Sequence, residues 1–367
     1  MKKKILFILH YPPPVHGAAM VGKFIKESDF INSAFDCTYI NLGTSTNLGD
    51  IGKSGLGKIK SVFKIQWEVY KALKKIKPDL CYMTLTANGA GFYKDVLIVK
   101  VLKFFNTKII YHFHNKGFKQ SVTNGLNRFL HRFALRHTKS ILLSQHLYPD
   151  IRYYVKKDQI YVCPNGIPSS APVSNSKQKV APTLKVLYLS NMMVEKGVWI
   201  LLEACKILKL RSVNFQCDFV GDWFGINEDE FQSKVTEYGL STEVLAHGKK
   251  YGADKIDFFE NASVFVFPTF YRNECFPLVL LEAMDYALPV ISTPEGGIAD
   301  IVSEGETGFL VPQKDALALA DKLEFLSTQP LLSQEMGRAG KIRFDTLFTL
   351  VKFEKNLCNI LEKESFS

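Results

Sequence analysis

Short apolar segments alternate with longer amphipathic stretches along the first half of the chain. Four segments are typical of buried β-strands: residues 5–9, 36–41, 79–84 and 108–113. Apolar residues recur at helical spacing in 57–76, and residues 92–105 predict a second helix. Strands that alternate with helices in this way predict a parallel, doubly wound sheet.

The alternation is interrupted once, at residues 168–183. This segment, PSSAPVSNSKQKVAPT, is rich in Pro, Ser, Ala and Lys and lacks apolar periodicity, which predicts a linker. Alternation then resumes, with strands at 185–189, 215–220 and 264–267 and helices at 198–210, 316–327 and 346–363. A chain of 367 residues is long enough for about two domains. We therefore predict an α/β protein with two Rossmann-like, doubly wound domains, 1–168 and 184–345, and an interdomain cleft for ligands.

Charge is distributed unevenly along the chain. Residues 1–170 contain 26 Lys and Arg against 9 Asp and Glu, whereas residues 171–367 contain 20 against 27, for a total of +10. Such an imbalance indicates that the first half faces an anionic partner. Nucleic acid and an acidic membrane surface both fit on charge alone, and so does a basic surface that is simply solvated. No nucleic-acid recognition motif is present, so we expect no nucleic acid partner.

The cysteines and the apolar runs bear on the compartment. Seven scattered cysteines without a C-x-x-C pair are typical of reduced, buried thiols. The apolar run after MKKK stops at His10, so we interpret it as a first strand rather than a signal peptide. No stretch reaches the roughly 18 apolar residues that span a bilayer. These features favour a cytoplasmic protein.

A helix that begins without a cap is predicted after the strand at 264–267. Pro277 suits the first helical position, where its missing N–H costs nothing. The residue types before it, Cys and Phe, do not cap helices. The amides of Leu278 and Val279 would therefore lack an internal partner. Together with the helix dipole they predict a site for an anion such as phosphate.

Two carboxylates flank this helix start. Glu274 precedes the helix, and Glu282 lies about a turn and a half inside it. Because helical side chains lean toward the N-terminus, Glu282 can reach polar groups near the helix end. Either carboxylate alone could be a solvated charge. The pair with the uncapped helix between them predicts a site for a ligand that carries both phosphate and hydroxyl groups.

The segment 265–312 resembles the signature of the family 4 glycosyltransferases, retaining sugar transferases of the two-domain GT-B fold. The family's E-x7-E pattern is present as Glu274 and Glu282 in ECFPLVLLE, followed by ALPVIST, Gly296-Gly297 and TGFLVP. The resemblance implies transfer of a sugar from a UDP- or GDP-linked donor, without a metal or another cofactor. It also implies that a last helix, 346–367, crosses back to the N-terminal domain.

The resemblance further implies roles for individual residues. Glu274 would orient hydroxyls of the donor sugar. Lys196, in YLSNMMVEKG, matches a lysine that contacts the donor diphosphate. Asn191 replaces the usual arginine of this motif, which removes a cation and a bidentate fork. Arg272 could supply the missing charge. The donor-binding residues would be Asn191, Phe276, Pro277, Leu278, Val279 and Glu282.

Two N-terminal motifs match the family in the same way. In HYPPPVHGAAMVGKF, Gly17 and Ala18 fall in a small-residue loop that faces the donor diphosphate and the acceptor. After the strand at 108–113, His114 matches a histidine near the acceptor and the donor sugar. Alternation places His112 on the same side, so both are candidates. A zinc site at this pair is an alternative without cysteine or carboxylate ligands nearby, and we predict no metal.

The acceptor is expected on the basic half of the chain. In LNRFLHRFALRH, residues 126–137, apolar residues occupy one helical face and arginines a neighbouring stripe. With the lysines between 71 and 77, this suits docking on anionic lipid headgroups and a glycan or lipid-linked acceptor at the inner face of the cell membrane. The alternative is ordinary core packing beneath solvated arginines.

The resulting functional prediction is a retaining glycosyltransferase in surface polysaccharide or glycolipid assembly. A catalytically decayed GT-B scaffold or regulator is the main alternative, because Asn191 weakens the phosphate site. A sugar-nucleotide epimerase of the same fold is less consistent with E-x7-E followed by TGFLVP.

Overall fold

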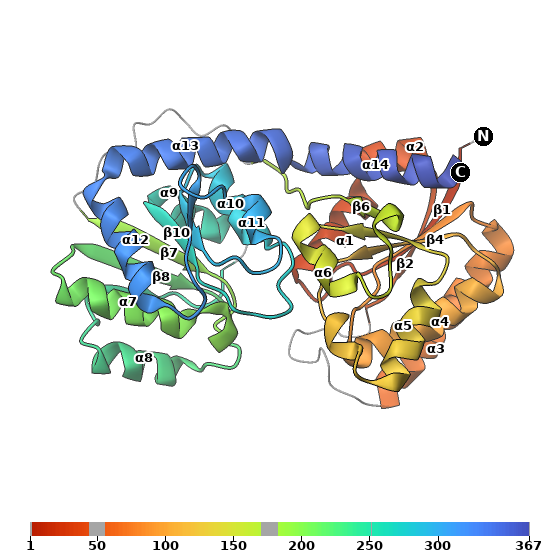
Figure 1. Ribbon diagram of the computed structural model, residues 1–367, viewed down its shortest axis with the longest axis horizontal. Coiled ribbons are helices and arrows are strands. Elements are labelled where there is room, and N and C mark those ends of the chain that lie inside the picture. The colour runs from red at the N-terminus through yellow and green to blue at the C-terminus, as the bar shows by residue number, and fades with distance from the viewer. Residues whose placement is uncertain (1, 44–55, 170–182, 251, 367) are drawn as a thin grey trace. The chain divides into compact units, whose positions relative to one another are not determined.

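The computed structural model describes residues 2–43, 56–169, 183–250 and 252–366 (Figure 1). The chain forms two compact units, residues 1–166 with 350–367 as unit 1 and residues 167–349 as unit 2. Most of the predicted linker, residues 170–182, lies outside the described residues.

Unit 1 is built on a six-stranded parallel sheet. Its strands are β1 (Lys4–Leu9), β2 (Asp36–Asn41), β3 (Leu80–Met83), β4 (Ile109–Phe113), β5 (Lys139–Leu142) and β6 (Ile160–Val162). The order is β2-β1-β3-β4-β5-β6, with Lys4 paired to Asp36 and Ile5 to Leu80. Apart from His112 in β4, the buried positions of β1, β3 and β4 are apolar, because both faces of a parallel sheet are covered by helices.

Helices cover both faces of this sheet. They are α1 (Gly17–Glu27), α2 (Asp29–Ala34), α3 (Leu56–Ile76), α4 (Gly89–Phe104), α5 (Gly125–Leu135), α6 (Tyr148–Ile151) and α14 (Leu350–Phe366). Helices α3, α4 and α5 pack in sequence, and α14 packs on α2 and β3 (Figure 1). Right-handed crossovers explain which helices cover each face of the sheet. The connection through α1 and α2 runs from β1 to β2 in one direction along the sheet, whereas the connections through α3, α4 and α5 run to β3, β4 and β5 in the other direction.

Unit 2 repeats the architecture. Its strands are β7 (Leu184–Leu189), β8 (Phe215–Val220), β9 (Val244–Ala246), β10 (Val264–Phe267), β11 (Val290–Ser292) and β12 (Gly308–Leu310). All are parallel, in the order β12-β11-β10-β7-β8-β9. The helices are α7 (Val198–Leu210), α8 (Glu228–Glu237), α9 (Ile256–Asn261), α10 (Leu278–Asp285), α11 (Ile298–Ile301), α12 (Ala316–Thr328) and α13 (Pro330–Leu347). Two doubly wound parallel sheets confirm the predicted fold class.

The C-terminal helices differ from the prediction. The sequence pattern predicts one helix at 346–363, but α13 already occupies Pro330–Leu347, and α14 begins at Leu350. Gly337 and Gly340 weaken the helical signal of α13. They also permit close packing, since a Cβ on Gly337 would lie 1.9 Å from the carbonyl oxygen of Ala287. Tertiary contact with α10 therefore outweighs the low local propensity.

Within the described residues, no helix combines the length and the apolar character that crossing a bilayer requires.

Candidate functional site

The carboxyl ends of β7 and β10 mark the switch point of the sheet in unit 2. Strand order reverses between these two strands, and ligands of open α/β sheets bind beyond such a point. The segment after β7 carries Asn191 and Lys196, and the segment after β10 carries Glu274 and the start of α10. The topology thus brings together groups that lie about 80 residues apart in sequence.

Helix α10 begins without a side-chain cap. Pro277 is the N-cap residue, with φ −68° and ψ 121°, rather than the first helical residue as predicted. In the described part of the chain, no acceptor is found for the amides of Leu278 and Val279. The helix dipole and these two free donors together favour an anion at the start of α10.

Glu274 and Lys196 form an ion pair beside this helix start. Lys196 Nζ lies 2.5 Å from Glu274 Oε2, and only 15% and 11% of the two side chains are exposed. The ammonium also lies 4.7 Å from the ring centroid of Tyr271. A carboxylate this deeply buried needs a charged partner, and Lys196 is that partner. Both are predicted site residues, but their direct contact does not follow from the sequence pattern.

Two glycines hold the loop that carries Glu274. Gly197 has φ +87°, and a Cβ there would lie 2.3 Å from the carbonyl oxygen of Pro268. Gly296 has φ +60°, and a Cβ there would lie 2.3 Å from the carbonyl oxygen of Glu274. Any other residue would meet both a backbone clash and an unfavourable conformation at either position. Backbone from two neighbouring segments therefore fixes this loop.

Glu282 pairs with a residue that the sequence analysis missed. Lys255, the last residue of a short 3₁₀ helix (Gly252–Lys255), places its Nζ 2.6 Å from Glu282 Oε1. About a quarter of each side chain is exposed, so Glu282 remains partly accessible. No spacing rule connects the two positions, because Lys255 belongs to the segment between β9 and β10.

The other predicted residues of unit 2 are arranged in different ways. The carbonyl of Asn191 accepts from Tyr188 Oη at 3.2 Å, and within the described ranges its side-chain amide has no partner. Arg272 is exposed and forms no ion pair with any described residue. The Phe276 side chain is buried against Phe348, with ring centroids 5.7 Å apart. Phe276 therefore contributes to packing through its side chain.

In unit 1, the small-residue loop forms the start of α1. His16 is the N-cap, and its Nδ1 accepts from the amide of Ala19 at 3.3 Å. Gly17 is exposed, and a Cβ there would meet no described atom within 4 Å. Ala18 is half-buried beside it. The backbone at Gly17 is thus open to approach.

Histidines gather near the carboxyl ends of β1 and β4. His10 Nδ1 lies 3.3 Å from Thr84 Oγ1, and the rings of His10 and His16 are 6.1 Å apart. His114 Nε2 is buried without a hydrogen-bond partner in the described structure. Burial, followed by the charge of His16, lowers the pKa of His114 to about 3, so its ring is neutral.

The second predicted histidine belongs to the core. His112 is fully buried, and its Nδ1 lies 2.6 Å from Tyr82 Oη. Burial, followed by the charge of His114, lowers its pKa well below the ordinary value. Among the described residues, no group of three His, Cys, Asp or Glu side chains is arranged to hold a metal ion.

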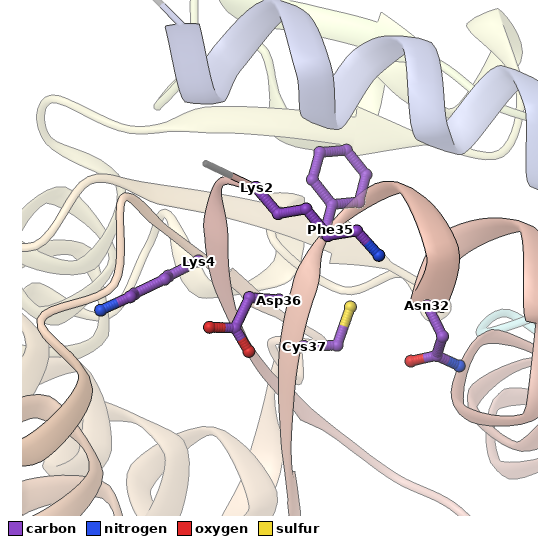
Figure 2. A pocket seen from close by; sticks show the side chains of 6 residues that line it. All are labelled: Lys2, Lys4, Asn32, Phe35, Asp36 and Cys37. Atoms are coloured by element: carbon purple, nitrogen blue, oxygen red, sulfur yellow. The ribbon is translucent and has the colours of Figure 1, made fainter.

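A surface hollow lies at the opposite end of the strands of the unit 1 sheet. It is formed at the amino ends of β1 and β2 (Figure 2) and is lined by Lys2, Lys4, Asn32, Phe35, Asp36 and Cys37. None of the predicted site residues contributes to it. The strand ends that carry His10 and His114 are therefore separate from this hollow.

Comparison with known proteins relates this chain to glycosyltransferases. Residues 173–343 match the family model described as glycosyl transferases group 1. The chain is 32% identical over 166 residues to the capsular polysaccharide biosynthesis glycosyltransferase CapM of Staphylococcus aureus, covering 44% of this chain and 41% of that protein. It is 29% identical over 170 residues to the putative colanic acid biosynthesis glycosyltransferase WcaL of Salmonella typhimurium, covering 45% and 41%. The matched segments thus span about two fifths of these relatives.

The fold has a counterpart among solved structures. The crystal structure of Anabaena Alr3699/HepE in complex with UDP superimposes with a TM-score of 0.74 at 18% identity, covering 98% of this chain and 100% of that one. At this identity the likeness concerns the fold. The chain has the GT-B fold of glycosyltransferases, and its C-terminal half is similar in sequence to the glycosyl transferases of group 1.

Proposed function

We propose that this chain is a retaining glycosyltransferase of family 4, whose signature is the E-x7-E pair Glu274 and Glu282. It would transfer a sugar from a UDP- or GDP-linked donor without a metal ion. The observation that carries the proposal is the uncapped start of α10 next to the buried Lys196–Glu274 pair. Free amides and a lysine suit a diphosphate, and the carboxylates suit hydroxyl groups.

The reaction can be assigned to groups at this site. The bond between the sugar and the diphosphate breaks, and the charge that develops on the leaving oxygen is stabilised by the amides of Leu278 and Val279 and by Lys196. Glu282 accepts from the ribose hydroxyls, while Glu274 orients the donor sugar. The acceptor oxygen attacks the donor sugar from the same face from which the leaving group departs, and the acceptor's proton passes to the leaving phosphate oxygen. Retention of configuration follows.

Unit 1 would supply the acceptor side. The neutral ring of His114 and the open backbone at Gly17, next to Ala18, suit recognition of hydroxyl and phosphate groups. We propose a glycan or lipid-linked acceptor in surface polysaccharide or glycolipid assembly. The proposal is supported by the names of CapM, a capsular polysaccharide biosynthesis glycosyltransferase, and WcaL, a putative colanic acid biosynthesis glycosyltransferase. Work on a lipid-linked acceptor would place the protein at the cytoplasmic face of the cell membrane, in contact with anionic lipid.

Metal-free thermal unfolding in the presence of UDP, GDP, ADP or CMP tests the donor site. A nucleotide at 100 times its Kd should stabilise the wild type by about 2.7 kcal/mol. Glu282→Ala should abolish the shift, because the ribose loses its acceptor. Glu260→Ala removes an exposed carboxylate of α9 and should leave the shift unchanged. Absence of a shift with every nucleotide would reject the transferase and favour a decayed scaffold.

A further inference from the structure

Helices α3, α4 and α5 form one layer of unit 1 (Figure 1). Gln66 Nε2 of α3 donates to the carbonyl of Leu97 in α4 at 3.1 Å. Tyr93 Oη of α4 donates to Asn127 Oδ1 of α5 at 2.6 Å. These bonds join the exposed sides of neighbouring helices, so the three helices present a continuous outer face.

This outer face exposes several large apolar side chains. In α3, Phe63 and Trp67 are 61% and 55% exposed, although Ile65 and Val69 of the same helix are buried. Such exposure also contradicts the alternative that α5 buries its apolar residues, since Leu126 and Phe129 are 61% and 65% exposed. Among the described side chains of the three helices, the large apolar ones that are exposed are Phe63, Trp67, Tyr93, Leu97, Phe104, Leu126 and Phe129. We call these seven residues the apolar face.

Positive charge surrounds the apolar face. The three helices contain eleven Lys and Arg but only two acidic residues, Glu68 and Asp95. Asp95 is fully buried, and Glu68 lies 4.0 Å from Lys64. Lys71 Nζ lies 5.3 Å from the ring centroid of Trp67, so a lysine ammonium lies over an aromatic ring of the apolar face. The exposed acidic charge is therefore one carboxylate.

An anionic lipid bilayer complements this combination of apolar and basic side chains better than a second copy of the chain does. A second copy of the chain docked through the same face would bring two strongly basic surfaces together, which like-charge repulsion opposes. An anionic bilayer offers both of the required complements, with headgroups for the lysines and an interfacial region for Trp, Tyr and Phe. Amphipathic aromatic rings beside lysines are typical of residues that settle at this interface.

Two helices of the apolar face, α4 and α5, begin at the end of the unit 1 sheet where His10 and His114 lie. The charge of Lys94, in the first turns of α4, contributes to lowering the pKa of His10 after burial. Tyr93, the preceding residue, belongs to the apolar face. The N-terminal ends of α4 and α5 follow the carboxyl ends of β3 and β4, the edge where His114 lies. A bilayer on this face would therefore present lipid-linked molecules near that edge.

From these observations we infer that the apolar face of α3, α4 and α5 docks on an anionic bilayer. The inference deepens the proposed function. It rests on that function in one respect only, that the lipid-linked molecule is the acceptor. Docking itself requires neither donor binding nor catalysis.

Flotation of the full chain with vesicles tests the inference. The protein should bind vesicles of phosphatidylglycerol and phosphatidylcholine, should not bind phosphatidylcholine alone, and should dissociate in high salt. The triple variant Phe63→Ser, Trp67→Ser and Phe129→Ser should lower the partition coefficient at least tenfold, which corresponds to about 1.4 kcal/mol. Lys100→Glu, Arg128→Glu and Arg132→Glu combined should do the same by removing charge.

Matched variants on unit 2 control for general surface changes. Leu210, Leu331 and Ile342 are 78%, 68% and 67% exposed, and their replacement by Ser should leave vesicle binding unchanged. The inference would be overturned if this control lost vesicle binding equally, or if binding did not depend on lipid charge. It would also be overturned if the wild type bound no vesicles but self-associated, and the first triple variant abolished that self-association. Nucleotide-dependent thermal shifts on the same samples distinguish this failure from failure of the donor site.

Discussion

Lys255 is the residue whose role is most open to a direct test. Its Nζ lies 2.6 Å from Glu282 Oε1, and it has no equivalent in the patterns that pointed to the site. An ion pair that leaves each side chain about a quarter exposed contributes about 1 kcal/mol or less to stability. Its larger effect should be on ligand binding, because it fixes which oxygen of Glu282 faces the nucleotide.

We expect Lys255→Ala to raise the Kd of the nucleotide about tenfold, or about 1.4 kcal/mol, while Lys255→Arg retains most of the affinity. Titration calorimetry measures both. Lys209→Ala is the matched control, since Lys209 pairs with Glu243 at 2.9 Å on another part of unit 2. The idea fails if Lys255→Ala binds nucleotide like the control, or if arginine gives no rescue.

At the scale of elements, the site depends on how closely the segment after β7 approaches the loop after β10. Gly197 makes this approach possible, because a Cβ there would lie 2.3 Å from Pro268 O. Gly239 also has a positive φ, +68°, but beyond its chain neighbours no described atom lies within 4 Å of its Cβ position. Alanine substitutions at the two glycines therefore distinguish the cost of backbone strain alone from the cost of strain combined with a steric clash.

Gly197→Ala should cost more stability than Gly239→Ala. Strain alone predicts about 1 kcal/mol for Gly239→Ala, and the clash should bring Gly197→Ala to about 3 kcal/mol or more. Gly197→Ala should also weaken nucleotide binding, because it displaces the loop that carries Glu274. Urea unfolding at equilibrium gives the two free energies. Equal losses would show that Pro268 moves aside without effect.

At the scale of the whole molecule, the sequence predicts the layers better than the contacts within the site. Alternating segments predicted both sheets because buried parallel strands are apolar and their helices are amphipathic. Helix α13 was missed because its glycines lower helix propensity while serving packing on α10. The carboxylates and Lys196 followed from motifs, but the Lys255–Glu282 pair depends on folding that no local pattern encodes.

Acid should weaken the protein chiefly through unit 1. Seven of the eight histidines belong to this unit, and burial lowers the pKa of His10, His16, His112 and His114. A histidine held neutral in the folded state binds a proton only after unfolding, once the pH falls below about 6.5. The stability that it contributes is therefore complete above this pH and decreases as the pH falls toward the folded pKa, about 3 for His114.

The slope of stability against pH tests this argument. Each such histidine contributes up to about 1.4 kcal/mol per pH unit below pH 6.5. Between about pH 7.5 and about pH 5.5, the free energy of unfolding should fall less in His114→Gln than in the wild type, because one titrating group is gone. His146→Gln removes an exposed histidine and should retain the wild-type slope. Identical slopes in all three proteins would mean that His114 carries its proton in the folded state as readily as in the unfolded chain, and the neutral ring assigned to the acceptor side would then be wrong.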